Sequence, residues 1–296
     1  MVSANDRRLG KNYPYVIGHQ FGNGYRAYRI TEQLKQTLPV GELAMFNLQL
    51  DTKSDFYAFY QQLALNSLTA KAIAIQPDLA EIRDYLLAWD GRADVGSLGF
   101  ALLVEFRKQL IGAVFTPFLS SSREADKSFS YSWTYIDTPL QALLSEKPSQ
   151  LLPDAAHYRN WDDFILGQLK LGMQHLQAQH PGVALMELNW GRQNKVNHMH
   201  PFSRALPILS DLLDMPREPL PGCAYCVRAA GPDFGATERL VVSPSHFEEA
   251  ILHAPGGQSS HPLSPNYRDQ QNYWLKGLSM SLTAEKPDHT LLLQPH

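Results

Sequence analysis

Residues 255–270 read PGGQSSHPLSPNYRDQ, and the segment WLKG follows with Trp274 and Gly277 at its two ends. Glycine reaches positive φ, and proline fixes φ while removing a backbone donor, so this stretch predicts a fixed series of turns. Polar loops in general do not combine Gly-Gly-Gln-Ser, Ser-Pro-x-Tyr-x-Asp-Gln and Trp-x-x-Gly in one order. This order is the strongest indication of the fold in the chain.

The same order of motifs resembles the C-terminal signature of the penicillin acylase (penicillin amidase) family. Ser260 and Asn266 stand where members commonly have Gly and His. The resemblance implies a hydrolase of the N-terminal nucleophile (Ntn) superfamily, built as a four-layer αββα sandwich. We expect this chain to be the C-terminal portion of the large (beta) chain: an α+β unit with a mainly helical part, residues 1–185, and a strand-and-loop part, residues 186–296.

Composition agrees with a globular protein. The 296 residues are 44% hydrophobic with a net charge of −3, which gives no reason to expect nucleic acid as a partner. The most apolar long segment, residues 98–119, contains Glu105, Arg107 and Lys108, so no membrane span is expected. The first residues contain no apolar signal-peptide core, and a periplasmic location is implied only by the family resemblance.

Apolar residues recur at helical spacing in the first part of the chain. Ser54, Asp78 and Ser97 are suitable N-cap residues for three of these segments, and Ser120-Ser121-Ser122 should break the longest one. The spacing predicts helices over residues 26–38, from about 54, from about 78 to 89, 97–119 and 160–177. In the second part, residues 226–228, 239–242 and 290–293 have the β-prone composition of short strands.

Ala4-Asn5-Asp6, followed by Tyr-Pro, Ile-Gly and an Arg-x-x-x-Ile segment from Arg26 to Ile30, also resembles the family. The resemblance implies that Asn5 donates its side-chain amide to the oxyanion hole and that Arg26 borders the substrate pocket. Asp6 stands where many relatives have a second Asn. The alternative is that Asn5 and Asp6 only shape a turn, as these residue types often do.

Other segments identify the family and have structural interpretations. Gln49-Leu50-Asp51 with Ser54, and Trp89-Asp90-Gly91, match family segments, but Asp51 and Ser54 would cap a helix and Trp89 would lie in the core. The run from Gly231 through Arg239 into Leu-Val-Val resembles a family strand, with Ser243 in place of the usual Asp.

Four residues could be tested as zinc ligands: His198, His200, Cys223 and Cys226. One CxxC with one HxH is a weak metal signal, and two free or locally bridged thiols are favoured instead. Many family members hold calcium through an acidic residue ahead of the Arg helix. Residues 7–31 contain no Asp or Glu, so we expect that site to be absent or altered, with no metal and no cofactor.

The family mechanism needs a Ser, Thr or Cys as the first residue of the catalytic chain, with its own α-amino group as base. This sequence begins Met1-Val2-Ser3 and contains no Gly-x-Ser-x-Gly elbow or His-Glu-x-x-His motif. We therefore expect a fragment that is inactive alone, whose nucleophile comes from N-terminal acylase segments. The implied reaction is hydrolysis of an acyl-amide of the β-lactam side-chain or acyl-homoserine lactone class, which would place the family in antibiotic biosynthesis.

A different class of function is also open: a truncated, non-enzymatic paralogue that acts as a binding or assembly module. In either case, loss of the sheet partners should expose apolar surface or strand edges, so self-association is expected. The sequence does not define the acyl group or the amine.

Overall fold

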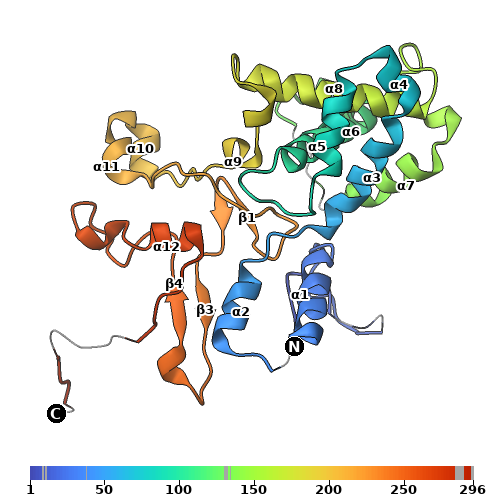
Figure 1. The fold of residues 1–296 in the computed structure, drawn as a ribbon. Coiled ribbons are helices and arrows are strands. Elements are labelled where there is room, and N and C mark those ends of the chain that lie inside the picture. Colours follow the sequence, from blue (N-terminus) through green and yellow to red (C-terminus); the bar gives the residue numbers. More distant parts are fainter. Residues whose placement is uncertain are drawn as a thin grey trace.

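The computed structural model describes residues 1–8, 10, 12–37, 39–129, 133, 135–283 and 290–294. Helices predominate over short antiparallel strands in these residues, which confirms a mixed α+β chain (Figure 1). The α-helices are α1 (Tyr25–Gln36), α2 (Glu42–Gln49), α3 (Ala58–Ser67), α4 (Ala70–Ile75), α5 (Leu79–Leu87), α6 (Leu98–Ala125), α7 (Asp137–Glu146), α8 (Trp161–Gln179), α9 (Trp190–Gln193), α10 (Pro201–Ala205), α11 (Ser210–Leu213) and α12 (Gln271–Lys276). The strands are β1 (Ala230–Gly231), β2 (Phe234–Gly235), β3 (Arg239–Val241) and β4 (Ile251–His253).

Helix α6 is the centre of a helical body that also contains α3, α5, α7 and α8 (Figure 1). Its apolar stripe, including Phe106 and Leu110, is fully buried against α8. The two helices approach closely at Gly172, where an added Cβ would lie 3.2 Å from the backbone nitrogen of Phe106. The periodic apolar residues of these helices thus produce the main core of the protein.

The start of α6 was predicted correctly and its end was not. Ser97 caps the helix by accepting a hydrogen bond from the backbone N–H of Phe100 at 3.1 Å. The three serines 120–122 do not break it, because the helix continues through Pro117 and these serines to Ala125. Each serine is only weakly unfavourable inside an exposed helix, since its side chain can bond to the preceding turn, as Ser120 does to Pro117.

The other two predicted caps are wrong. Ser54 precedes a 3-10 turn, Asp55–Tyr57, and α3 begins only at Ala58. The hydroxyl of Ser54 is buried and has no hydrogen-bond partner among the described residues. Asp78 precedes α5 but makes no side-chain cap bond. Helices α3 and α5 are therefore stabilised by packing of their apolar faces rather than by their first residues.

Two predicted strands are also wrong. Residues 226–228 form a bend, and residues 290–293 have no regular structure. The predicted strand at 239–242 is confirmed as β3, which pairs antiparallel with β4 in the register Arg239↔His253 and Val241↔Ile251. The αββα sandwich of the resemblance remains an expectation, since the described strands form only two-stranded sheets.

The motif-rich segment 255–277 holds the second part of the chain together. Gly257 lies so close to the next loop that an added Cβ would be 2.0 Å from the carbonyl oxygen of Asn266. The Tyr267 hydroxyl donates to the carbonyl of Leu213 at 2.6 Å, and the Gln271 amide donates to that of Pro216 at 2.9 Å. Trp274 is fully buried in a small separate core that also contains Val196, Leu220 and Ala230. The turns that the sequence predicts therefore bring distant loops into packing contact.

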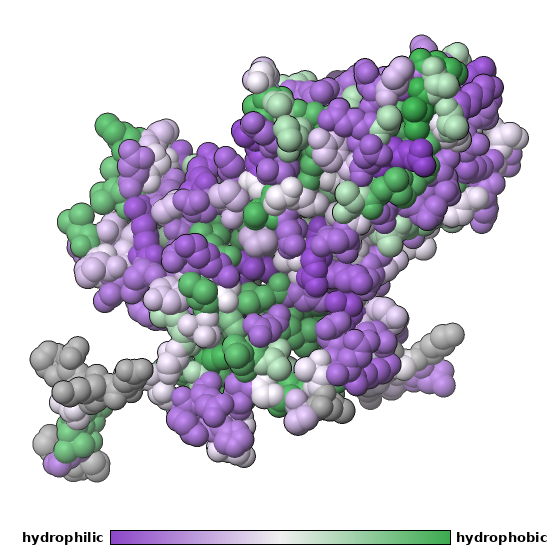
Figure 2. All heavy atoms as spheres, in the orientation of Figure 1, coloured by the Kyte–Doolittle hydropathy of each residue, from purple (hydrophilic) through white to green (hydrophobic). Residues whose placement is uncertain are grey.

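No helix in the described part of the chain has the length and apolarity that a membrane crossing needs. Apolar side chains are nonetheless exposed where α2 and the β3–β4 hairpin lie, at the lower centre of Figure 2. Leu43 of α2, Leu240 of β3 and the neighbouring Val242 belong to this exposed set.

Candidate functional site

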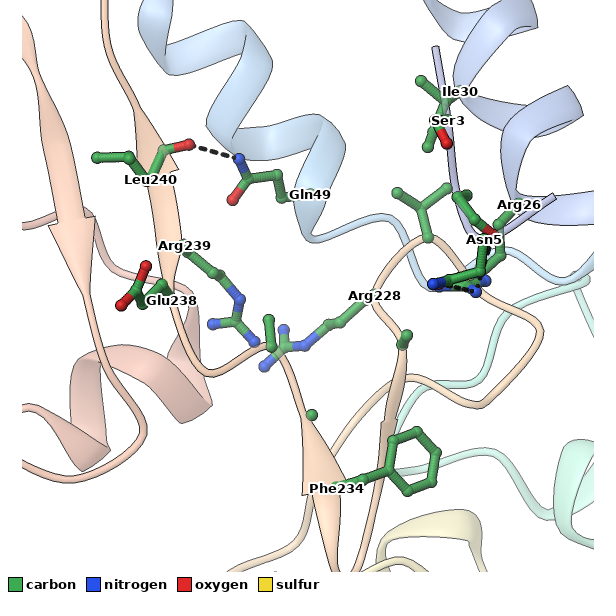
Figure 3. Close-up of a pocket in the computed structure, with 15 residues that line it drawn as sticks. Ser3, Asn5, Arg26, Ile30, Gln49, Arg228, Phe234, Glu238, Arg239 and Leu240 are labelled. Carbon is green, nitrogen blue, oxygen red and sulfur yellow. Dashed lines mark hydrogen bonds between the residues drawn. The ribbon is translucent and has the colours of Figure 1, made fainter. Parts of the chain in front are cut away.

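A cavity of about 670 Å³ lies between the first residues of the chain, α1, α2 and the β1–β3 region (Figure 3). Ser3, Asn5 and Arg26 line one side of it. Arg228 and Arg239 line the other side. The cavity therefore brings together both residues that the resemblance assigned to the site and two further cationic side chains.

Arg26 fixes the orientation of the Asn5 side chain. Its Nη2 donates to Oδ1 of Asn5 at 2.9 Å and to the carbonyl oxygen of Ala4 at 3.0 Å. A guanidinium can only donate, so the amide oxygen of Asn5 must face Arg26. The Asn5 Nδ2 group is left without a hydrogen-bond partner among the described residues and can donate to a bound group.

The backbone around Asn5 needs an unusual conformation. Asn5 has φ of 63°, a left-handed value that asparagine tolerates better than most residues. Its carbonyl oxygen accepts from the N–H of Gly22, and Asp6 pairs with Gly22 in a parallel bridge. A Cβ at Gly22 would lie 3.1 Å from the carbonyl of Ala4, so glycine permits this approach. Asn5 thus both shapes a turn and lines the cavity, so the two interpretations are compatible.

Burial lowers the pKa of Arg26, while the nearby negative charge of Asp6 opposes the shift. Asp6 also forms an ion pair with Arg8 at 2.7 Å. The Asp6 carboxylate thus supports the Arg26 side of the cavity through charge rather than by direct contact with Asn5.

Arg228 and Arg239 form what we call the arginine pair. Nη2 of Arg228 donates to the carbonyl oxygen of Leu275 at 2.5 Å and lies 3.4 Å from that of Trp274. Nη1 of Arg239 donates to the same Trp274 oxygen at 2.5 Å. The two guanidinium groups are therefore neighbours, as Figure 3 shows, and both hold the C-terminal end of α12.

Asp51 does not cap a helix, contrary to the expectation. Its carboxylate forms ion pairs with Arg29 at 2.7 Å and with Arg92 at 3.4 Å, outside the cavity. Gln49, from the same family segment, does reach the cavity, where its amide donates to the carbonyl of Leu240 at 3.1 Å. The segment therefore joins α2 to β3 and to α1.

The two cysteines form a disulfide with each other, with a Cα–Cα distance of 5.1 Å. The zinc interpretation is therefore wrong for Cys223 and Cys226. No three His, Cys, Asp or Glu side chains in the described ranges come close enough to hold a metal ion. His198 instead packs against the indole of Trp274, and burial lowers its pKa. His200 caps α10 by accepting from the N–H of Phe202.

The disulfide also positions Arg228. The short loop it closes carries Tyr225, whose ring stacks on Phe56 with the centroids 3.8 Å apart. Immediately after the loop, the N–H of Arg228 donates to the carbonyl of Asp51 at 2.9 Å, and its carbonyl accepts from Cys223. The Arg228 backbone is thereby fixed between the helical body and the cavity.

Sequence reasoning did not assign the arginine pair to the site. Arg239 appeared only as a marker of a family strand and Arg228 only as part of a β-prone run. The available signal was an arginine inside each of two short apolar runs, Cys-Val-Arg and Arg-Leu-Val-Val. Charged residues in such runs are seldom buried without a partner, so an arginine there indicates a candidate site residue.

The fold and the cavity define an α+β protein with an oriented amide and three arginines around one pocket. The family model for penicillin amidase matches residues 1–289, and the chain belongs to that family. A similar curated protein is the penicillin acylase 2 proenzyme of Pseudomonas sp. (strain SE83), 26% identical over 290 residues. The match covers 93% of this chain and 35% of that protein, so the chain spans about a third of the length of this relative.

Proposed function

We propose that this chain forms one side of the active site of an acylase that hydrolyses the amide between an acyl group and an amine. Membership of the penicillin amidase family and similarity to a penicillin acylase proenzyme support this class of reaction. The β-lactam side-chain and acyl-homoserine lactone classes are the substrates that we propose to test. The αββα sandwich of the Ntn superfamily is the proposed complete fold.

The contact between Arg26 and Asn5 is the observation that carries the proposal. Attack on an amide places negative charge on the carbonyl oxygen, and a donor that is already oriented stabilises that charge without reorganisation. Arg26 holds Asn5 so that its Nδ2 is free to donate (Figure 3). We propose that Asn5 contributes to the oxyanion hole and that Arg26 both orients Asn5 and borders the substrate.

We propose that the nucleophile belongs to a separate acylase segment that completes the site. Ser3 is the one cavity-lining residue with a hydroxyl group, and this hydroxyl has no hydrogen bond to a base among the described residues. Without such a base, a serine hydroxyl is a weak nucleophile. The chain alone should therefore not turn over a chromogenic acyl-amide, and a segment carrying an N-terminal nucleophile should restore turnover.

The test compares Asn5→Ala with Asn23→Ala in an enzyme that includes the nucleophile segment. Loss of one oxyanion donor should lower kcat by roughly 10²–10³-fold with little change in KM. Asn23 is exposed and does not line the cavity, so its variant should retain activity. Equal kcat for the Asn5→Ala variant and the parent would refute the assignment. Turnover by the chain alone would refute the external nucleophile.

The disulfide supports the periplasmic location that we propose from the family resemblance, because such bonds persist in oxidising compartments. The test is alkylation of the protein in freshly lysed cells. Cys223 and Cys226 should resist the reagent until a reductant is added. Free thiols in native lysate would contradict the location.

We also propose that the isolated chain self-associates through the exposed apolar side chains of α2 and β3. Leu43 is 59% exposed and Leu240 is 47% exposed. Apolar surface next to a short edge strand favours association. Light scattering should show an average mass that rises with protein concentration. The Leu240→Lys variant should show a smaller rise. A monodisperse monomer at high concentration would exclude this proposal.

A further inference from the structure

The arginine pair is a buried concentration of positive charge. Arg228 is 6% exposed and Arg239 is 2% exposed. Neither forms an ion pair with a carboxylate among the described residues, although Glu238 is next to Arg239 in sequence. Two like charges this close are costly in a low-dielectric environment unless an opposite charge is near.

The hydrogen bonds of the pair are incomplete. Both side chains donate to carbonyl oxygens at the end of α12, which carry only a partial negative charge. Nε of Arg228 is buried without a partner among the described residues. Arg239 makes no second hydrogen bond within the described residues. A guanidinium carries five donors, and most of those in the pair are unused.

A third group near the pair also lacks a partner. His253 of β4 is fully buried, and neither of its ring nitrogens has a hydrogen-bond partner among the described residues. Burial, followed by the charges of Arg239 and Arg228, lowers its pKa to about 4. Burial likewise lowers the pKa of Arg228 to about 10 and that of Arg239 to about 9, the latter with a contribution from Arg228. The Asp94 carboxylate opposes the shift of the Arg228 pKa only in part, so all three shifts indicate positive charge that is not fully compensated.

We propose that the arginine pair is a binding site for one carboxylate that enters from the cavity. A carboxylate accepts up to four hydrogen bonds, and its two oxygens match the planar fork of a guanidinium. The ammonium group of lysine is a point charge and offers no such fork. Both arginines line the cavity, so an anion can reach them without opening the helical body. The site does not depend on the proposed role of Asn5. Its carboxylate belongs to a bound small molecule or to an acidic side chain of a completing acylase segment.

The test uses the chain itself with acetate as the probe and acetamide as the neutral isostere. Acetate should bind saturably in the millimolar range at constant ionic strength, measured by calorimetry and by the rise in Tm, and acetamide should not bind. Arg239→Gln should weaken acetate binding about tenfold or more, since loss of a charge-assisted bond is worth about one decade in affinity. Arg217→Gln is the control, because Arg217 is exposed and does not line this cavity.

Arg239→Lys provides a second variant in case the Gln variant does not fold. It keeps one positive charge and one donor for the Trp274 carbonyl but loses the fork, so it should fold and bind acetate more weakly. An equal response to acetate and chloride, or unchanged affinity in both Arg239 variants, would overturn the proposal.

The acetate titration is then repeated on an enzyme that includes the nucleophile segment, and the result identifies the source of the carboxylate. Retained acetate binding assigns the site to a small-molecule carboxylate. Binding that is lost in that enzyme, and regained when one acidic residue of the added segment is neutralised, assigns the site to that side chain. If binding is lost and no acidic residue restores it, the proposal fails for the complete enzyme.

Discussion

The guanidinium of Arg239 lies over the indole of Trp274, with its central carbon 4.8 Å from the ring centroid, and donates to the carbonyl oxygen of the same residue. One tryptophan thus contacts a cavity arginine through both its ring and its backbone. The indole N–H in turn donates to the carbonyl of Ala236 at 2.8 Å. The tryptophan of the C-terminal signature therefore has a structural role: it supports the arginine pair.

Replacement of Trp274 by Phe should lower the free energy of unfolding by roughly 1–3 kcal/mol, because the part-buried hydrogen bond from the indole to the Ala236 carbonyl is lost and the fully buried site is left underfilled. Urea denaturation followed by circular dichroism measures the change. Tyr273→Phe is the control, since that side chain is 39% exposed and its hydroxyl has no hydrogen-bond partner among the described residues. Equal stability of the two variants would show that the indole hydrogen bond contributes nothing.

Glycine to alanine substitutions in α6 and α8 should have opposite effects. Gly172→Ala would place a methyl group 3.2 Å from the Phe106 backbone, and separating the two helices should cost about 1–3 kcal/mol. Gly112→Ala, on an open face of α6, should add roughly 0.5–1 kcal/mol through helix propensity. Thermal denaturation of both variants tests the close approach. A stabilising Gly172→Ala would contradict it.

His253 should make the protein sensitive to acid. Its folded-state pKa of about 4 lies below the ordinary value of 6.5, so the unfolded chain binds the proton more readily between these two pH values. Stability should therefore fall as the pH drops from 6.5 toward about 4. His253→Leu removes the group and should flatten this part of the profile. Urea titrations near pH 7 and near pH 5 measure it, and a variant with the parent's pH dependence would exclude His253 as the cause.

Reduction of the Cys223–Cys226 disulfide should lower the free energy of unfolding by about 2 kcal/mol, since the bond closes a short loop. Chemical denaturation with and without a reductant gives the difference. The double variant Cys223→Ser/Cys226→Ser should be less stable and should not respond to the reductant. A reductant effect that persists in the double variant would have another origin.

The sequence predicts best the long helices, whose repeated apolar positions lie within one continuous segment. Helices α6 and α8 repeat their apolar positions over many turns, so periodicity locates both helices and the Ser97 cap locates the first residue of α6. Helix α4 was missed because its six residues, AKAIAI, are too few to show a period, and its start depends on the Thr69 cap. Short helices of this kind are stabilised by tertiary contacts more than by propensity.

The site shows the same division. The motifs around Asn5 and Arg26 suggested a shared pocket, and the structure places the two side chains in contact. Arg228 and Arg239 became neighbours of that pocket only because both reach the carbonyls of Trp274 and Leu275, which lie far along the sequence. No local sequence pattern indicates such a long-range contact. The roles of these residues in catalysis or binding remain predictions for the experiments above.

The hydrogen bonds from the arginine pair to α12 also determine the order in which parts of the chain can fold during synthesis. The helices between Ala58 and Gln179 contribute most of the main core, to which Leu188, Cys223 and Cys226 are added later, and they can begin to pack while the ribosome is still adding residues. The two guanidinium groups have to wait for Trp274 and Leu275 to be translated before they reach their final positions. A nascent chain that stalls before Trp274 would present folded helices beside an unfinished, positively charged surface, which a chaperone or protease could recognise.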